Sequence, residues 1–412
     1  MGNIIKVQKG TKDILPNEMP LWHLMEENAK RIFSNAGYNE IRTPVFEATE
    51  LFARGVGDTT DIVNKEMYTF EKSERSLTLR PENTAGVVRS FIENGMHRLS
   101  APVKLWYKGP MFRYERPQAG RQRQFHQVGV EMFGINDASA DAEIIEIAVE
   151  YLHSLGLNDL VVEINSLGCS DCREKFKQNL IEVLKPYYED LCDSCKTRYY
   201  KNPLRLLDCK VDSCKEIFET TDVKAVIQGD FICDDCKGHF EELKSYLDSL
   251  GIKYIVNKLL VRGLDYYNRT VFEIKSNNLG AQNAVCGGGR YDNLVSNLGG
   301  QPTPAIGFAM GMERLFSLMS EVDAKKLDAY VVAADKNEAL KLVKFLRGNN
   351  IKTDFDFTGK KFTKQMEKAS KVADYAIILG EDEIAANVVS VKNLMTSEQR
   401  TVSRDDLLGI FR

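Results

Sequence analysis

The most informative stretch of this 412-residue chain runs from Lys108 to Gly134, KGPMFRYERPQAGRQRQFHQVGVEMFG. Its alternation of polar and apolar residues predicts two strands, over residues 110–115 and 125–133, joined by a loop. One face then carries Arg113, Glu115, Phe125, Gln127, Gly129 and Glu131, and the other turns Phe112, Tyr114, Val128, Val130 and Met132 toward the core. Because burial of unpaired charges is costly, the polar face must meet a ligand or solvent. A hairpin with one face in water is the alternative.

The loop over residues 116–124 holds three arginines, three glutamines, a proline and a glycine, which indicates contact with phosphate or nucleic acid. Phe125 at its end is placed to stack on a base. The sequence FRYE at 112–115, followed by Arg121 and Phe125, resembles motif 2 of the class II aminoacyl-tRNA synthetases. The resemblance implies that Arg113 binds the α-phosphate of ATP and Arg121 the γ-phosphate, that Phe125 stacks on adenine, and that Glu115 lies in the ATP site.

Composition excludes several other classes of protein. With 43% hydrophobic and 28% charged residues, the chain is typical of a soluble globular protein of two or three domains. It has no run of about 18 apolar residues and no apolar signal core at its start, so we expect a cytoplasmic location and no membrane contact. The net charge of −4 argues against a uniformly basic surface that binds nucleic acid. Any contact with tRNA must therefore be confined to part of the surface.

The N-terminal part predicts a helix over residues 17–36, stopped by Gly37, and then a strand in which Pro44 should interrupt the ladder or lie at a sheet edge. This order resembles motif 1 of the class II enzymes, which implies a homodimer, although an amphipathic helix packed on a sheet is an alternative. Residues 66–86 predict a hairpin and a helix that begins near Pro81. Its first turn contains Glu82, Asn83 and Thr84, which would bind an ion or cap the helix. The sequence TLRPE resembles the loop of histidyl-tRNA synthetases that binds the substrate amino group.

A helix over residues 139–155, with Ser139 as its cap, and a strand over 160–168 lead into a cysteine-rich segment, about 168–256. This segment holds eight of the nine cysteines, in three CxxC pairs and one Cx4C pair: Cys169 and Cys172, Cys192 and Cys195, Cys209 and Cys214, Cys233 and Cys236. The spacing fits structural Zn²⁺, and unliganded structural cysteines are the alternative, so metal content stays open. Histidyl-tRNA synthetases carry a mostly helical insertion here that is thought to hold the tRNA acceptor stem, but the cysteines are not part of the family pattern.

Residues 259–274, LLVRGLDYYNRTVFEI, supply the planar guanidinium group of Arg262 and two aromatic rings with hydroxyl groups, those of Tyr266 and Tyr267. They resemble the first histidine-specific motif of the family. AVCGGGRYDNLV, at 284–295, resembles the second motif, and we interpret its three glycines as backbone kept clear of a small substrate. TPAIGFAMGMERLFSLM, at 303–319, predicts a helix with Gly307 and Gly311 one turn apart. It resembles motif 3, which implies that Arg314 binds the γ-phosphate.

A charged passage at 321–328 marks a linker, after which strands and helices alternate. The alternation predicts a small α/β domain with a largely parallel sheet. Five lysines, Lys360, Lys361, Lys364, Lys368 and Lys371, would form a solvated helix face or contact RNA. The family resemblance implies that this domain binds the anticodon.

The expected fold is α+β: a class II catalytic domain at 1–325, whose antiparallel sheet is flanked by helices, and an anticodon-binding domain at 326–412. The resemblance implies a histidine–tRNA ligase that uses ATP and Mg²⁺ to form histidyl-adenylate and then charges tRNA(His). It assigns Arg113 and Arg262 to catalysis at the α-phosphate. It assigns histidine to Glu82, Asn83, Thr84, Gln127, Glu131, Tyr266 and Tyr267, of which Glu131 and Tyr267 take the imidazole nitrogens. A non-catalytic regulatory subunit of histidine biosynthesis and another class II synthetase are the rival interpretations.

Overall fold

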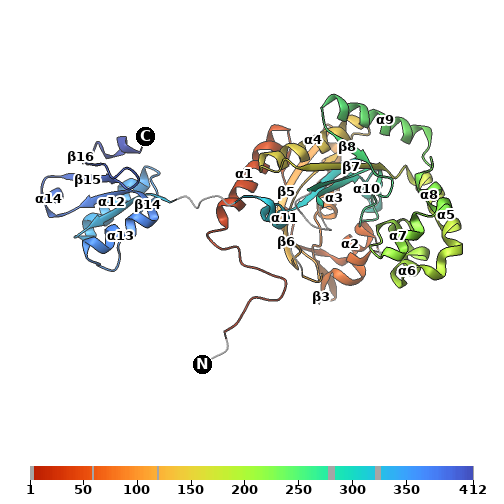
Figure 1. The fold of residues 1–412 in the computed structure, drawn as a ribbon, viewed down its shortest axis with the longest axis horizontal. Helices are drawn as coiled ribbons and strands as arrows, with labels where there is room; N and C mark the ends of the chain where they lie inside the picture. The colour runs from red at the N-terminus through yellow and green to blue at the C-terminus, as the bar shows by residue number, and fades with distance from the viewer. Residues whose placement is uncertain (1–3, 58–59, 118–119, 277–283, 321–325, 412) are drawn as a thin grey trace. The chain divides into compact units, whose positions relative to one another are not determined.

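The structure, a computed structural model, describes residues 4–57, 60–117, 120–276, 284–320 and 326–411. The chain divides into two compact units, residues 1–321 and 322–412 (Figure 1). Residues 321–325 of the expected linker, and Gln118 of the arginine-rich loop, lie outside the described residues. Within the described part of the chain, no helix is both long and apolar enough to cross a membrane.

The larger unit is built on an eight-stranded sheet in the order β1-β5-β6-β11-β10-β9-β7-β8. Its strands are β1 (Asn39–Glu40), β5 (Val103–Phe112), β6 (Gln124–Phe133), β11 (Ala305–Gly311), β10 (Ala284–Arg290), β9 (Asn268–Ser276), β7 (Leu160–Ser166) and β8 (Tyr254–Val256). All pairings from β5 to β7 are antiparallel, and only the outermost strands, β1 and β8, pair in parallel. The predicted antiparallel sheet is confirmed.

Helices bury both faces of this sheet. One face packs against α1 (Met19–Asn35), α4 (Ala138–Ser154) and α9 (Asp234–Ser249), and Val128, Val130 and Met132 of β6 lie in that core as predicted (Figure 1). The other face packs against α3 (Thr84–Glu93) and the short α10 (Leu294–Asn297), in a core that includes several tyrosines. The helix predicted at 17–36 is confirmed, and it ends before Gly37, whose φ of +84° suits glycine.

The hairpin expected before Pro81 is present as β3 (Tyr68–Lys72) and β4 (Arg75–Leu79), which form a second sheet with β2 (Phe46–Ala48) next to α2 (Thr49–Val56). Two predicted helix starts were wrong. Helix α3 begins at Thr84, because the Glu82 carboxylate lies ahead of it and accepts the first N–H groups. Helix α4 is capped by Asp137 rather than Ser139, because the Asp137 side chain accepts from the Ser139 N–H.

The central hairpin also differs from its prediction in one strand. β5 begins at Val103 and ends at Phe112, so residues 113–115 lie beyond its end. Tyr114, expected in the core, is 53% exposed and lies under the guanidinium of Arg123, 3.8 Å from its ring centroid. Phe112 is only half-buried. The chain leaves the sheet here because its next residues turn into the arginine-rich loop.

The stretch predicted as one helix at 303–319 is strand β11 followed by the short helix α11 (Met312–Leu318). Glycines four residues apart share a face on a strand as well as on a helix. In β11 the glycine face pairs with the polar face of β6: Gly307 lies opposite Glu131, and Gly311 opposite Gln127. Ile306, Phe308 and Met310 fill the core on the other face.

The cysteine-rich segment is largely helical. It contains α5 (Ser170–Leu184), α6 (Asp193–Lys201), α7 (Asp212–Phe218) and α8 (Thr221–Gln228), linked by 3-10 turns η3 (Lys185–Asp190) and η4 (Pro203–Asp208). These elements form a group with its own small apolar core, before α9 returns to pack on α4 (Figure 1).

The smaller unit has a five-stranded sheet in the order β13-β12-β14-β15-β16. Its elements are β12 (Leu327–Ala333), α12 (Lys336–Gly348), β13 (Thr353–Phe355), α13 (Phe362–Val372), β14 (Ala373–Leu379), α14 (Glu381–Ala385), β15 (Val388–Asn393), β16 (Gln399–Ser403) and the turn η5 (Leu407–Ile410). Strands β12, β13 and β14 are parallel, whereas β15 pairs antiparallel with β14 and the unpredicted β16 pairs antiparallel with β15, so the sheet is only partly parallel. The five lysines at 360–371 are exposed.

Candidate active site

A cavity of about 240 Å³ lies where β6, β10 and β11 meet the arginine-bearing segments. Its walls include Arg113, Glu115, Arg121, Phe125, Gln127, Arg262, Glu273, Cys286, Gly287, Glu313 and Arg314. The structure therefore brings together every residue that the sequence assigns to ATP, with both predicted catalytic arginines.

The two predicted catalytic arginines are held in place by different contacts. The Nε–H of Arg113 donates to the carbonyl oxygen of Pro81 over 2.8 Å, and its guanidinium lies 5.3 Å from the ring centroid of Phe125. Arg262 reaches the carboxylate of Glu273 over 2.6 Å, and its buried Nε has no hydrogen-bond partner among the described residues. A buried donor without a partner indicates a ligand with an acceptor atom.

The glycines of β10 make room for protein side chains. A Cβ on Gly287 would overlap the guanidinium of Arg262, and one on Gly288 would overlap the ring of Phe272. A protein side chain therefore already requires glycine at both positions, and the interpretation of these glycines as clearance for a substrate stays a prediction. Gly287 allows the guanidinium of Arg262 to lie against β10 at the cavity wall.

Two further arginines, Arg121 and Arg314, line this cavity. Arg121 lies 3.1 Å from a carboxylate oxygen of Glu115, and Arg314 donates to the carbonyl oxygen of Ala284 over 2.6 Å. Burial lowers the pKa of Arg314, and the nearby Arg121 lowers it further. An anion bound between these guanidinium groups would relieve their repulsion, which is the environment that a polyphosphate requires.

A second group of polar side chains lies farther along the same face of β6. Oε1 of the buried Glu131 accepts from the hydroxyl of Thr84 over 2.7 Å, and Oε2 accepts from the hydroxyl of Tyr291. Burial raises the pKa of Glu131 to about 8, although these two hydrogen bonds act in the opposite direction. Gly307 allows this carboxylate to approach β11, because a Cβ there would overlap Oε2.

Buried aromatic and polar residues surround Glu131. The Tyr266 ring centroid lies 4.6 Å from that of Tyr267 and 5.6 Å from that of Tyr291. Glu82 is buried at the start of α3, where its carboxylate accepts the N–H groups of Thr84 and Ala85 over 2.7 and 3.0 Å, and burial raises its pKa. We call Glu82, Thr84, Glu131, Tyr266, Tyr267 and Tyr291 the inner polar group.

Three predicted residues have distinct surroundings. Gln127 lies between the cavity and the inner polar group, and its buried Oε1 has no partner in the described part of the chain. The side-chain oxygen of Asn83 accepts from Thr43 over 2.6 Å and from Arg80 over 3.1 Å, so it ties the loop ahead of α3 to the body of the protein. Tyr266 also lines a neighbouring cavity of about 450 Å³, together with Arg54, Arg173 and Lys177.

Comparison with known proteins agrees with this geometry. A family model described as "Histidyl-tRNA synthetase" matches residues 10–184 and 194–315, and one described as "Anticodon binding domain" matches residues 328–412. The chain belongs to the histidyl-tRNA synthetase family. A relative named histidine–tRNA ligase from Acetivibrio thermocellus is 50% identical, over 98% of this chain and 99% of its own length. Another of that name from Desulforamulus reducens is 47% identical, over 97% of each chain.

Solved structures of the histidyl-tRNA synthetase family have the same fold. The apo histidyl-tRNA synthetase of S. aureus has a TM-score of 0.82 and 36% identity, with 99% of this chain and 100% of that chain covered. A Bacillus halodurans protein described as an ATP phosphoribosyltransferase regulatory subunit/histidyl-tRNA synthetase has a TM-score of 0.67 and 23% identity. The match covers 92% of this chain and 99% of that one, and this likeness concerns the fold alone.

Sequence reasoning missed three residues that this member of the histidyl-tRNA synthetase family brings to the site. Glu273 pairs with Arg262, and Glu313 accepts from both the backbone N–H and the ring of His126. The hydroxyl of Tyr107 lies against Gly129, where a Cβ would overlap it. Glu273 had a detectable signal, because a lone acid between Phe272 and Ile274 in a strand must face away from the core.

Proposed function

We propose that this chain is a histidine–tRNA ligase, which activates L-histidine with ATP and transfers it to tRNA(His). The observation that carries the proposal is the buried Glu131, hydrogen-bonded to Thr84 and Tyr291, beside a cavity lined by four arginines. An arginine-lined cavity suits ATP, and a buried polar group suits a small substrate with several nitrogen atoms.

The inner polar group would bind histidine. We assign the imidazole nitrogens to Glu131 and Tyr267, and the α-ammonium group to Glu82, Thr84 and Gln127. Burial raises the pKa of Tyr267 to about 12, so its hydroxyl keeps its proton and can donate. A site built on such hydrogen bonds rejects analogues that lack them by about 10⁴ to 10⁵. Asn83 would fix the loop that presents Glu82 and Thr84, and Tyr266 would form a wall of the site.

The first chemical step joins a carboxylate oxygen of histidine to the α-phosphorus of ATP and breaks the bond to the β-phosphate, releasing pyrophosphate. The carboxylate is already ionised at neutral pH, so the step needs alignment and charge neutralisation rather than a general base. We assign this task to Arg113 and Arg262 at the α-phosphate. Arg121 and Arg314 would hold the γ-phosphate, and Phe125 would stack on adenine.

Mg²⁺ fits the same cavity, because carboxylate oxygens of Glu115 and Glu273 line it and oxygen atoms are the ligands this ion prefers. It would supply further neutralisation of the phosphates. The hydroxyl at the tRNA terminus then takes the acyl group, and AMP leaves.

We assign catalysis to residues 1–325 and anticodon binding to residues 326–412, where the exposed lysines of α13 would contact tRNA(His). A homodimer is also part of the proposal, because Phe46 and Phe70 of the small sheet are 54% and 43% exposed. We place the enzyme in the cytoplasm, where tRNA is charged. The regulatory-subunit alternative does not require four arginines at a nucleotide cavity or an anticodon-binding domain.

ATP–pyrophosphate exchange tests the first step, with each of the twenty amino acids in turn. We expect exchange with histidine alone, and a loss of roughly a thousandfold in Arg262→Ala, because a preorganised donor to the developing charge is removed. Arg98→Ala, a change of an exposed arginine outside the cavity, should retain wild-type exchange. Exchange with another amino acid would assign a different substrate, and exchange with none would favour the regulatory subunit.

A further inference from the structure

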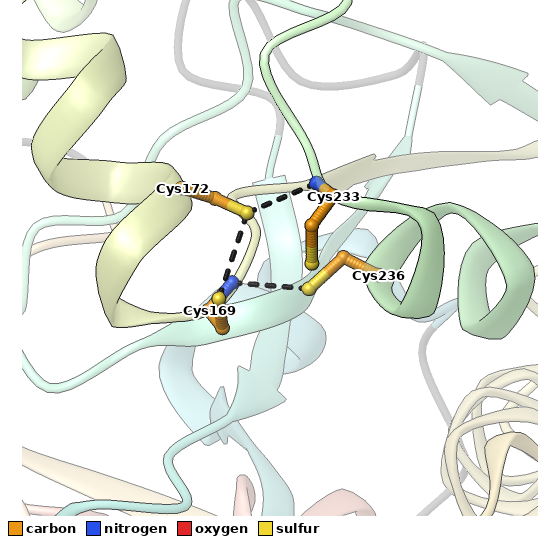
Figure 2. Close-up of side chains that lie close together, drawn as sticks. All are labelled: Cys169, Cys172, Cys233 and Cys236. Carbon is orange, nitrogen blue, oxygen red and sulfur yellow. Dashed lines mark hydrogen bonds between the residues drawn. The ribbon is translucent and has the colours of Figure 1, made fainter.

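Eight cysteines of the helical insertion form two groups of four. The base cluster contains Cys169, Cys172, Cys233 and Cys236, and the inner cluster contains Cys192, Cys195, Cys209 and Cys214. Within each cluster all four sulfur atoms lie within 4.8 Å of one another. Figure 2 shows the four side chains of the base cluster turned toward a common centre. The ninth cysteine, Cys286 in β10, lies in neither cluster.

The sulfur–sulfur distances fit one tetrahedral ion in each cluster. The two Sγ atoms are 3.5 Å apart for Cys169 and Cys172, and 3.8 Å apart for Cys192 and Cys209. A Zn–S bond of about 2.3 Å places the corners of a tetrahedron about 3.8 Å apart. A disulfide would bring its sulfur atoms to about 2 Å, and all nine cysteines are free. An iron–sulfur cluster would place several atoms between its ligands and so requires a wider ring of cysteines.

The backbone around the base cluster favours thiolates. Cys169 and Cys233 are the N-caps of α5 and α9, so the positive ends of two helix dipoles point at the cluster. The N–H of Cys169 donates to Sγ of Cys236 over 3.2 Å, and the N–H of Cys233 donates to Sγ of Cys172 over 3.1 Å (Figure 2). Each CxxC turn thus donates to the second cysteine of the other turn.

The inner cluster repeats part of this arrangement. Cys192 is the N-cap of α6, and its N–H donates to Sγ of Cys214 over 3.3 Å. Cys209 follows η4 and Cys214 lies in the first turn of α7, so the cluster joins three short elements. These elements share one small apolar core, and small cores commonly need a metal ion or disulfides to fold stably.

The base cluster closes the insertion at its junction with the sheet. Cys169 follows β7 on the way out, and Cys233 begins α9 on the way back. Next to it, Arg173 donates to the carbonyl oxygen of Asp265 over 3.4 Å, and Asn202 donates to the Asp265 carboxylate over 2.6 Å. The insertion therefore holds the residue that precedes Tyr266 of the inner polar group.

We propose that each cluster binds one Zn²⁺ through four cysteine thiolates, so that each chain carries two structural zinc sites. Each ion would displace the four thiol protons, and the resulting charge of −2 would be offset by the N–H donors and helix ends. Four protein ligands leave no open position for a substrate, so the sites are structural rather than catalytic. The proposal goes beyond aminoacylation and does not depend on it.

Metal analysis of the untagged full-length protein, washed with a weak chelator, tests the proposal directly. We expect two zinc ions per chain, and a zinc X-ray absorption spectrum of four sulfur ligands at about 2.3 Å. Absence of zinc, zinc bound by oxygen or nitrogen, iron in place of zinc, or cysteines paired as disulfides would each overturn it. These measurements are independent of activity, so they separate failure of the zinc proposal from failure of the proposed ligase function.

Single substitutions assign the ions to their clusters. Cys172→Ser and Cys195→Ser should each bind one zinc ion instead of two, and Cys286→Ser is the matched control that should keep both. Retention of two tightly bound ions in Cys172→Ser and Cys195→Ser would contradict the assignment. If a variant does not fold, titration of the wild-type protein with a thiol-modifying reagent and a chromogenic chelator replaces it. Release of two zinc ions per chain is then expected, and release of none would overturn the proposal.

Discussion

Glu131 is almost fully buried, and yet its carboxyl group lies in a site proposed to bind a polar substrate. Its carboxylate accepts from Thr84 and Tyr291, and its neighbour Gly307 makes room for it. Burial raises its pKa to about 8, so the empty site holds this carboxyl mostly protonated at neutral pH. A substrate that donates a hydrogen bond to Glu131 would favour its ionised form.

Glu131→Gln should make stability less dependent on pH. The folded protein keeps a proton on Glu131 up to a pKa of about 8, whereas the unfolded chain releases it near the ordinary value of 4.5. The folded state thus binds more protons in this window, so the wild type loses stability relative to the variant as pH rises from about 5 to 8. The difference should reach at most roughly 4 kcal/mol, measured by denaturant unfolding at several pH values.

The same substitution should raise the KM for histidine in pyrophosphate exchange by roughly tenfold to a hundredfold, which corresponds to about 1.5 to 3 kcal/mol for a hydrogen bond to a charged group. The KM for ATP should stay unchanged, because Glu131 is not among the residues that line the arginine-rich cavity. Equal changes in both constants, or an unaltered pH profile of stability, would contradict the role assigned to Glu131.

At the scale of elements, strands β6 and β11 form the floor of the proposed site through complementary side-chain sizes. The large polar residues on this face of β6 lie opposite glycines of β11: Gln127 pairs with Gly311, and Glu131 with Gly307. This pairing also explains why residues 303–319 were wrongly predicted to form a single helix. Glycine spacing by itself does not distinguish a strand from a helix, and Glu131, the partner that requires Gly307, is about 180 residues away in the chain.

Gly307→Ala should therefore destabilise the protein by about 1 to 3 kcal/mol, the usual cost of overpacking. The added methyl group would overlap the Glu131 carboxylate and the backbone oxygen of Val130. Gly311→Ala is the matched control in the same strand, because no described atom lies within 4 Å of its added Cβ. Thermal unfolding of the two variants measures the difference, and equal midpoints would contradict the proposed packing of β11 against Glu131.

Local patterns predicted most of the elements, because hydrophobic alternation and helix caps act over a few residues. The strand at Gln124–Phe133 and the helix at Met19–Asn35 are examples. Contacts between distant segments could not be predicted from local patterns. Glu273 meets Arg262 only because β9 lies beside β10 and the residues that precede β9 fold back over the sheet. The motif resemblance supplied the site residues, but it did not indicate that Gly287 makes room for the guanidinium of Arg262.

At the scale of the whole molecule, the chain consists of two units with separate cores. The smaller unit buries residues such as Val331, Leu342 and Ile377 around its own sheet, independently of the core of the larger unit. The residues of the proposed histidine and ATP sites all lie in the larger unit, whereas the match to the anticodon-binding domain covers residues 328–412. We therefore expect adenylation to depend on the larger unit alone and tRNA charging to depend on both units.

Truncation of the chain after residue 321 should separate adenylation from tRNA charging. Histidine-dependent pyrophosphate exchange should persist within a few-fold of the full-length rate, because every proposed adenylation residue is retained. Charging of tRNA(His) should fall by at least about tenfold, since contacts with the phosphate backbone carry much of the affinity for nucleic acid. Loss of exchange in a truncated protein that remains folded by circular dichroism would show that adenylation needs both units.

In the full-length chain, Lys364→Ala with Lys368→Ala should lower the rate of tRNA charging without changing pyrophosphate exchange. It should also weaken the dependence of charging on salt, because both lysines are exposed on α13.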